Sequence, residues 1–258
     1  MPLPDLPAPH SNWALFLDVD GTLVEIAATP GAVHIEANVL GVLRRLMETF
    51  GNAVALISGR SIEAVDELFK PLRLPVAGLH GLEVRNVTGS THRVAGESEH
   101  LEAIRKALRE YADATTGILL EDKGATLALH YRQAPTEKEA AKALIAGLLD
   151  GQSDYHVLEG KMVLEVKPTH VHKGWAIERL LAEVPFTGRL PVYIGDDVTD
   201  EDGFITVNRL GGHSIRIGAD GDSAATWRID SVHALLGWVA ALPDAILTTA
   251  KSQESRQA

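Results

Sequence analysis

The chain has 258 residues, 45% of them hydrophobic and 23% charged, a composition typical of a globular protein built as one large α/β unit or two smaller domains. Its formal net charge of -11 at pH 7 provides no broad cationic surface for a nucleic-acid backbone, so we expect no nucleic-acid partner. It contains no cysteine, which excludes disulfides, thiolate nucleophiles and zinc–thiolate sites.

Residues 1–12 contain neither a basic segment nor a continuous apolar one, so this segment does not resemble a secretory signal. No apolar run approaches the roughly 20 residues that a membrane-spanning helix needs. We therefore expect a cytoplasmic protein without a membrane partner.

The next part of the chain predicts the strand, helix, strand order of a doubly wound α/β fold. An apolar run over residues 13–17 ends in carboxylates, which is typical of a strand buried on both faces. A helix over 35–50 leads to a second apolar strand over 53–57. Ser61 then caps a short helix, and residues 75–79 form a third strand.

The same alternation resumes near the end of the chain. A helix over about 173–181 precedes a strand over 192–194, and a second strand over 214–217 precedes a helix capped by Ser231. The segment 84–168 instead predicts short strands in adjacent pairs with helices between the pairs. We interpret this segment as an antiparallel α+β insert in the parallel core.

Two aspartates follow the first predicted strand. Asp18 and Asp20, with Gly21 and Thr22, place two carboxylates, a flexible turn and a hydroxyl at one edge of the sheet. Carboxylates this close need a cation or a shared proton to relieve their repulsion. Taken alone, the pattern also fits an Asx-type turn that ends a strand.

The second predicted strand is followed by Ser58, Gly59 and Arg60. Adjacent parallel strands end at the same edge of a sheet, so these residues should lie near the two aspartates. The serine hydroxyl and the following amides can bind an anion, and the arginine can fork onto phosphate or sugar oxygens. Without this context, the segment is better explained as an ordinary strand-to-helix loop.

Five acidic residues crowd into the eight positions of 195–202, directly after a predicted apolar strand. Such crowding at the end of a buried strand favours a metal site, because Mg²⁺ prefers oxygen ligands. Part of the run also suits the start of a helix, where Asp200 can act as a cap and Glu201 and Asp202 complement the helix dipole. Lys173, where the chain re-enters the core, is the natural counter-charge.

Four segments follow one another in order: DVDGT at 18–22, SGR at 58–60, Lys173, and GDD at 195–197. Their order and their placement after strands resemble the haloacid dehalogenase (HAD) superfamily of phosphohydrolases. The insert looks like that superfamily's C2-type cap. The resemblance implies a Rossmann-like core formed by residues 1–83 and 169–258, with an α+β cap at 84–168 that sets substrate specificity.

Longer segments resemble the trehalose-6-phosphate phosphatase family of this superfamily. They are Gly195–Phe204, Leu79–Glu83, Glu121–Gly124, Leu129–Arg132 and Gly160–Val166. The resemblance implies hydrolysis of trehalose 6-phosphate to trehalose and phosphate in trehalose biosynthesis. We find no substitution at the core catalytic positions that argues against activity.

The resemblance also implies catalytic roles. Asp18 would attack phosphorus to form an aspartyl-phosphate, while Asp20 would protonate the departing sugar oxygen and later deprotonate the attacking water. Ser58 and Lys173 would hold phosphoryl oxygens, and Thr22 would add a hydroxyl donor.

A magnesium ion is the cofactor that the resemblance implies. Its ligands would be Asp18, the main-chain carbonyl of Asp20, and Asp196. Asp197 and Asp200 are candidates for water-mediated or indirect contact, and the sequence leaves their roles open.

Sugar recognition is expected on the insert. The resemblance places the trehalose hydroxyls on Glu121, Lys123 and Glu165, which lie on adjacent predicted strands. A salt bridge across an ordinary sheet surface is the alternative explanation. The weaker candidates for the same role are Arg60, His80, Arg132 and Lys161.

Three other functions stay open at this point. The same core and cap type would serve another sugar-phosphate phosphatase, such as one for sucrose phosphate or mannosyl-phosphoglycerate. A non-catalytic sugar-phosphate sensor and a phosphomutase are the alternatives from other classes. The sequence does not predict an oligomeric state.

Overall fold

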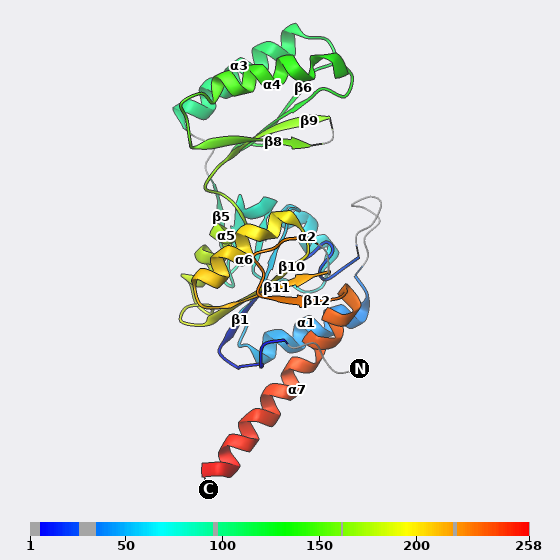
Figure 1. Ribbon diagram of the computed structural model, residues 1–258, viewed down its shortest axis with the longest axis vertical. Coiled ribbons are helices and arrows are strands. Elements are labelled where there is room, and N and C mark those ends of the chain that lie inside the picture. Colours follow the sequence, from blue (N-terminus) through cyan, green and yellow to red (C-terminus); the bar gives the residue numbers. More distant parts are fainter. Residues whose placement is uncertain (1–5, 26–34, 95–97, 161, 219–220, 258) are drawn as a thin grey trace. The chain divides into compact units, whose positions relative to one another are not determined.

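The computed structural model describes residues 6–25, 35–94, 98–160, 162–218 and 221–257 (Figure 1). These residues form two compact units. The first consists of Met1–His92 with His172–Ala258, and the second consists of Arg93–Val171.

The first unit contains an eight-stranded sheet in the order β12-β11-β10-β1-β2-β3-β4-β5. The strands are β1 (Trp13–Asp18), β2 (Val54–Ile57), β3 (Val76–Gly78), β4 (Glu83–Arg85), β5 (Thr91–Arg93), β10 (Leu190–Gly195), β11 (His213–Ile217) and β12 (Trp227–Ile229). All pairs from β12 to β3 are parallel, and β3 pairs with β4 in the antiparallel sense. The predicted doubly wound α/β class is therefore confirmed.

The chain runs outward from the middle of this sheet in both directions. It passes from β1 to β2 and β3 on one side, and from β10 to β11 and β12 on the other. The strands β1 and β10 are direct neighbours with Leu17 opposite Ile194. Strand order thus reverses between them, and ligands of open α/β sheets bind at the carboxyl ends of strands at such a switch point.

Helices cover both faces of the sheet (Figure 1). They are α1 (Ala37–Thr49), α2 (Ile62–Leu68), α5 (Lys173–Leu181), α6 (Glu201–Arg209) and α7 (Val232–Gln257), with short 3-10 turns η2 (Leu79–Gly81) and η4 (Val198–Asp200). Helices α5 and α6 pack against each other on one face, and α1 packs against α7 on the other. The two predicted caps are confirmed, because Ser61 accepts from the amide of Ala64 and Ser231 from that of Ala234.

One boundary differs from the prediction. The segment 84–93 was predicted to belong to the insert, but it contains most of β4 and all of β5, which extend the large sheet beyond β3. Arg85 also anchors this hairpin to the first unit, since its guanidinium donates to both oxygens of Asp66 on α2, each at 2.6 Å. The insert consequently begins at Arg93 and ends at Val171.

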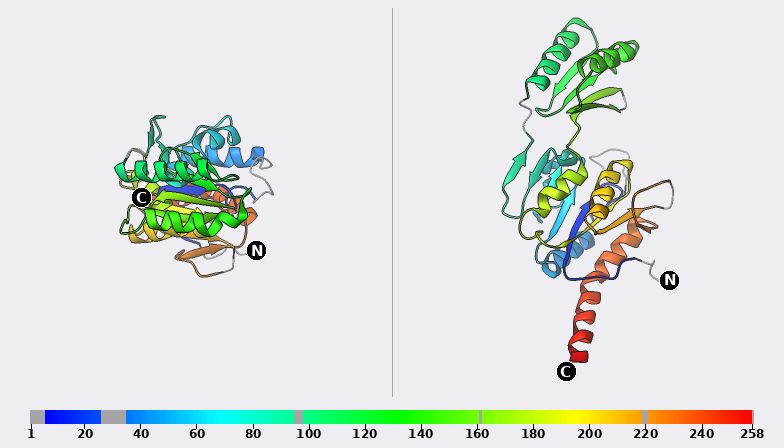
Figure 2. Two further views of the ribbon diagram at one scale, coloured as in Figure 1. Left: turned by 90° about the horizontal axis from the view of Figure 1, so that it is seen from above. Right: turned by 60° about the vertical axis from the view of Figure 1, so that its left-hand side comes forward.

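The second unit is an antiparallel sheet with two helices on one face (Figure 2). Its strand order is β6-β7-β9-β8. The elements are α3 (Glu99–Ala114), β6 (Leu119–Asp122), β7 (Leu127–His130), η3 (Pro135–Glu137), α4 (Lys138–Leu148), β8 (Tyr155–Gly160) and β9 (Val163–Pro168). Leu101, Ile104, Leu108 and Ile145 of the helices join the sheet in a separate hydrophobic core.

Helix α7 contains a stretch, Val232–Thr249, that is long and apolar enough to cross a membrane by length and composition alone. Polar residues interrupt this stretch, so it is not a continuous apolar run in the sequence. Leu235, Trp238 and Val239 of this stretch are buried in the core of the first unit. Packing against the core therefore accounts for the apolar side of α7.

Candidate active site

Asp18 and Asp196 meet at the switch point of the sheet. Asp18 is the last residue of β1, and Asp196 directly follows β10. After Asp18 the chain turns tightly, with the amide of Gly21 donating to the carbonyl of Val24 at 2.7 Å. The turn brings Gly21 against the Asp196 carboxylate, so both segments contribute to one site.

Lys173 joins two carboxylates of this site. Its ammonium donates to Asp18 Oδ1 at 2.8 Å and to Asp200 Oδ1 at 2.5 Å, and all three side chains are buried. Lys173 is the first residue of α5, whose start is capped by the side chain of His172. The start of this helix therefore sets the position of the ammonium.

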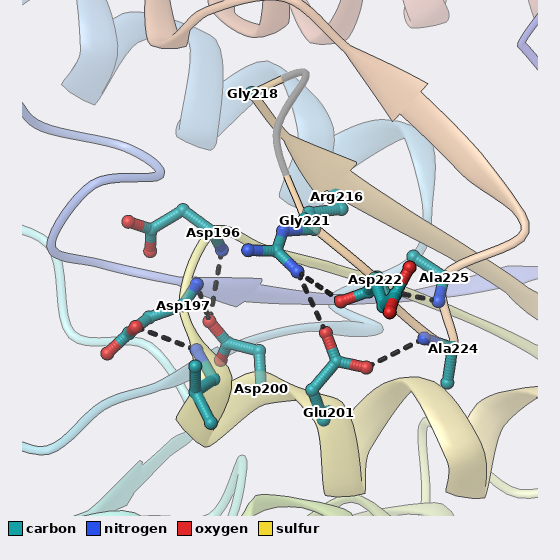
Figure 3. Close-up of polar contacts among 12 residues, drawn as sticks. Asp196, Asp197, Asp200, Glu201, Arg216, Gly218, Gly221, Asp222, Ala224 and Ala225 are labelled. Carbon is teal, nitrogen blue, oxygen red and sulfur yellow. Dashed lines mark hydrogen bonds and ion pairs between the residues drawn. The ribbon is translucent and has the colours of Figure 1, made fainter.

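Asp200 is the most heavily bonded carboxylate of the site (Figure 3). Its side chain is 0% exposed. Oδ1 accepts from Lys173 and from the hydroxyl of Tyr193. Oδ2 accepts from the main-chain amides of Asp196 and Asp197, each at 3.0 Å. Asp200 thus fixes the turn that carries Asp196.

Three carboxylates against one ammonium leave the buried site with excess negative charge. Burial, followed by repulsion from Asp200, raises the pKa of Asp18 from 3.8 to about 8. Burial and the charges of Asp200 and Asp197 raise the pKa of Asp196 to about 6. Burial lowers the pKa of Lys173, but Asp18 and Asp200 more than offset this and leave it above its ordinary value. A bound cation would relieve this repulsion.

The donor set fits a metal ion. One oxygen from each of Asp18, Asp196 and Asp200 lies within 4.8 Å of the others. Asp196 Oδ1 is buried without a hydrogen-bond partner among the described residues. Both oxygens of Asp200 already accept two hydrogen bonds each. Asp18 and Asp196 are therefore the better direct ligands, and Asp200 is better suited to hold them in place.

Two glycines permit this close packing. Gly21 has a φ of +83°, and a Cβ on it would lie 2.0 Å from Asp196 Oδ2. A Cβ on Gly195 would lie 2.4 Å from Asp200 Cγ. Any side chain at either position would displace a carboxylate of the site.

Thr22 and Ser58 are both buried beside this edge of the sheet. Thr22 Oγ1 has no hydrogen-bond partner among the residues that the structure describes. Ser58 Oγ accepts from the amide of Arg60 at 3.1 Å, which leaves its own proton free to be donated. Both hydroxyls are thus suited to an anionic ligand.

Arg60 contacts Asp20 in this structure. Its Nε and Nη2 donate to the two carboxylate oxygens of Asp20 at 2.7 and 2.6 Å. This fork raises the pKa of Arg60 above its ordinary value. The guanidinium that we expected on a phosphate or sugar oxygen here holds the second aspartate of the turn instead.

The three residues expected to bind sugar lie together on the second unit. Lys123 Nζ is 3.4 Å from Glu165 Oε1 and 3.8 Å from Glu121 Oε2. His130 Nε2, which the sequence did not single out, lies 3.0 Å from the same Glu121 oxygen. Lys161, a weaker candidate, lies outside the described residues.

Sequence reasoning also missed a network beside the acidic turn (Figure 3). Arg216, at the end of β11, donates to Glu201 Oε1 at 3.2 Å and to the carbonyl of Asp222 at 3.1 Å. The other Glu201 oxygen accepts from the amide of Ala224 at 2.7 Å. Glu201 therefore ties the first turn of α6 to the loop after β11, a role that its place near a helix start could not reveal.

Comparison with known proteins gives concordant matches. The family model for trehalose-phosphatase matches residues 16–233. A probable trehalose-phosphate phosphatase of Sinorhizobium fredii is 44% identical over 233 residues, covering 90% of this chain and 88% of that protein. A trehalose-6-phosphate phosphatase of Escherichia coli is 41% identical over 253 residues, covering 98% of this chain and 93% of that protein.

Solved structures agree with these matches. A trehalose-6-phosphate phosphatase of Aspergillus fumigatus superimposes with a TM-score of 0.71 at 26% identity, covering 90% of this chain and 93% of that one. A phosphatase of the haloalkanoate (HAD) enzyme superfamily from Bacteroides thetaiotaomicron gives a TM-score of 0.62 at 14% identity, covering 93% and 98%. The second likeness concerns the fold alone.

Proposed function

The chain belongs to the trehalose-phosphatase family, and we propose that it hydrolyses trehalose 6-phosphate to trehalose and phosphate, using Mg²⁺ and an aspartyl-phosphate formed on Asp18. One observation carries the mechanism. Asp18 Oδ1 is held by Lys173, while its second oxygen has no hydrogen bond from a described residue. The buried carboxylate thus keeps one oxygen for attack on phosphorus.

In the first half-reaction, the free oxygen of Asp18 forms a bond to phosphorus and the bond from phosphorus to the sugar oxygen breaks. Asp20 gives its proton to the departing sugar oxygen. Lys173, Ser58 and Thr22 hold phosphoryl oxygens, because each offers a donor at this edge of the sheet. In the second half-reaction, a water loses its proton to Asp20 and attacks phosphorus, which releases phosphate and restores Asp18.

Asp18, Asp196 and the main-chain carbonyl of Asp20 would hold the magnesium ion, and Asp200 would keep Asp196 in place. The ion would supply positive charge that neutralises both the clustered carboxylates and the phosphoryl oxygens.

The contact between Arg60 and Asp20 adds a requirement to this scheme. Both carboxylate oxygens of Asp20 accept from the guanidinium, whereas the first half-reaction needs one of them to face the departing sugar oxygen. We infer that substrate binding draws Arg60 away from Asp20. The freed guanidinium then turns to oxygen atoms of the substrate.

Glu121, Lys123 and Glu165 of the second unit would bind the sugar through its hydroxyls. Their ion pairs also fit the alternative of a salt-bridged sheet surface, and substrate kinetics separates the two. The proposal includes a cytoplasmic site of action, because a charged sugar phosphate does not cross a membrane unaided.

A panel of phosphorylated sugars, assayed for phosphate release with Mg²⁺ and with a chelator, tests the proposal. We expect trehalose 6-phosphate to be preferred over sucrose 6-phosphate and mannosyl-phosphoglycerate, and activity to be lost in chelator. Equal rates on all sugars would refute the substrate assignment and leave the phosphatase intact. Phosphate release also separates hydrolysis from a phosphomutase and from a sensor.

The nucleophile is tested separately. Asp18→Asn should abolish turnover while the protein stays folded by circular dichroism. Asp20→Asn, given an aryl phosphate with a good leaving group, should still be phosphorylated but should lose that phosphate slowly. Mass spectrometry of acid-quenched peptides should then find phosphate on the peptide containing Asp18. A phosphate on any other peptide would remove the assignment.

A further inference from the structure

The sheet of the second unit has one covered and one uncovered face. Residues that pair directly across antiparallel strands share a face, so the register sorts the side chains. The face toward α3 and α4 carries Leu127, Leu129, Leu164 and Val166. Figure 2 shows both helices over this face, and no described element of the second unit covers the other.

Two of the rows of side chains that cross the uncovered face carry its lysines and glutamates. In the first row Glu121 pairs with Ala128, which pairs with Glu165 on the next strand. The amide of Lys123 donates to the carbonyl of Thr126 at 3.0 Å, which continues the same register two residues further on. By the same register Thr126 lies opposite Lys167 on β9, and Lys167 pairs with His156 on β8. The second row therefore holds Lys123, Thr126, Lys167 and His156.

Two side chains of the second row lie low on this face, and the hydroxyl of Thr126 is buried without a partner. Thr126 is 0% exposed, and its Oγ1 has no hydrogen-bond partner among the described residues. Lys167 is 9% exposed, and no described residue hydrogen-bonds or ion-pairs with its ammonium. Burial lowers the pKa of Lys167, while the charge of Glu165 opposes this and that of Lys123 adds to it. Native proteins rarely leave such groups unsatisfied, which points to a ligand that supplies the missing partners.

The charges of this face indicate what kind of ligand fits. The ammonium groups of Lys123 and Lys167 equal the carboxylates of Glu121 and Glu165 in number, and His130 and His156 lie on the same face, so the face offers both hydrogen-bond donors and acceptors. An apolar ligand would cover the ammonium of Lys167 and leave the buried hydroxyl of Thr126 unpaired. An uncharged ligand with several hydroxyls satisfies both, because each hydroxyl can accept from the ammonium and donate to a carboxylate.

We propose that Lys167 and Thr126 are specificity residues that hydrogen-bond the hydroxyl oxygens of the sugar, on the floor of the surface that Glu121 and Glu165 flank. This inference rests on the proposed function, since it takes trehalose 6-phosphate as the occupant. Lys167 donates to a sugar oxygen, and Thr126 donates to or accepts from a neighbouring one.

Steady-state kinetics of the full-length enzyme with Mg²⁺ tests the inference. The measured quantity is the ratio of kcat/KM for trehalose 6-phosphate to kcat/KM for p-nitrophenyl phosphate, a small ester without a sugar. We expect Lys167→Met to lower this ratio about 10- to 100-fold, since it removes a charged hydrogen bond made only to the sugar. Lys106→Met, at an exposed lysine of α3, is the matched control and should leave the ratio unchanged.

Thr126→Val supplies an independent readout, because it removes only a hydroxyl and keeps the shape. We expect the ratio to fall about threefold or more, while the melting temperature without ligand rises slightly, since an unpartnered buried hydroxyl is lost. If the hydroxyl of Thr126 instead stabilised the folded protein, Thr126→Val would lower the melting temperature without ligand.

The outcomes separate this inference from the function on which it rests. If Glu121→Ala lowers the ratio but Lys167→Met and Thr126→Val leave it within twofold of wild type, the inference is overturned and the function stands. If the wild-type enzyme itself shows no preference for trehalose 6-phosphate over other sugar phosphates, the proposed function is refuted and the inference with it.

Discussion

Replacing Asp200 by asparagine should destabilise the protein although only one oxygen changes. An asparagine can keep its carbonyl toward Lys173 and Tyr193, but its NH₂ group then faces the amides of Asp196 and Asp197, which lose their acceptor. Each orphaned buried donor costs about 1–3 kcal/mol, so the two together cost about 2–6 kcal/mol.

One effect opposes this loss. The charge of Asp200 is a major cause of the raised pKa of Asp18, and its removal relieves that repulsion. We therefore expect a net destabilisation of about 2–4 kcal/mol. For a chain of this size, that corresponds to a fall in melting temperature of about 5–15 °C.

The assay is thermal unfolding of the full chain, followed by circular dichroism at pH 7 in the presence of a chelator. Asp197→Asn is the matched control, because Asp197 is exposed and caps η4 through a side-chain oxygen that asparagine retains. We expect the control to change the melting temperature by less than about 2 °C. A similarly small change for Asp200→Asn, or an equal change for both variants, would refute the reasoning.

Three further predictions concern the same edge of the sheet. Gly21→Ala should lower kcat/KM on the order of 100-fold, because the new Cβ displaces the Asp196 carboxylate. The same variant should bind Mg²⁺ more weakly in calorimetry, and an unchanged Mg²⁺ affinity would contradict this prediction. Without metal, the pKa of Asp18 is raised from 3.8 to about 8, so its contribution to stability is full below pH 4 and is lost as the pH rises through 8. In chelator, the melting temperature should therefore fall between pH 4 and pH 8 more for wild type than for Asp18→Asn. Added Mg²⁺ should raise the melting temperature of the wild type most at pH 8. Parallel pH profiles for the two proteins would argue against a raised pKa of Asp18. Arg60→Met should lower kcat/KM about tenfold or more for trehalose 6-phosphate but little for p-nitrophenyl phosphate, because the guanidinium freed from Asp20 is proposed to hold sugar oxygens that the small ester lacks; equal losses on both esters would exclude this role.

The core strands could be predicted because each buried strand is a continuous apolar run. All six residues of β1 are buried, and the carboxylate at its end is where the pattern placed it. The strand β12 was missed, since three residues with an arginine in the middle provide no periodic signal. Residues 84–93 were predicted in the insert rather than in the large sheet, because local pattern predicts that strands pair but not which sheet they join.

At the site, the sequence located residue types but not their partners. The spacing of the acidic run left Asp197 and Asp200 equivalent, whereas η4 turns Asp200 inward and leaves Asp197 exposed. The contact between Arg60 and Asp20 depends on the geometry of two loops, which no local pattern encodes. Thr126 and Lys167 were not singled out either, because burial without a partner becomes visible only in three dimensions.

The adjacency of β1 and β10 also bears on how the enzyme is made. During synthesis β1 emerges early, yet the strand that lies beside it and carries Asp196 emerges only after the whole second unit. The second unit is one unbroken stretch of chain and has its own hydrophobic core, so it is complete before the first unit can close its sheet. A nascent chain that has not yet reached β10 thus exposes one side of β1 and lacks two of the three carboxylates of the cluster, Asp196 and Asp200. The acidic cluster is therefore assembled only after β10 and η4 have emerged.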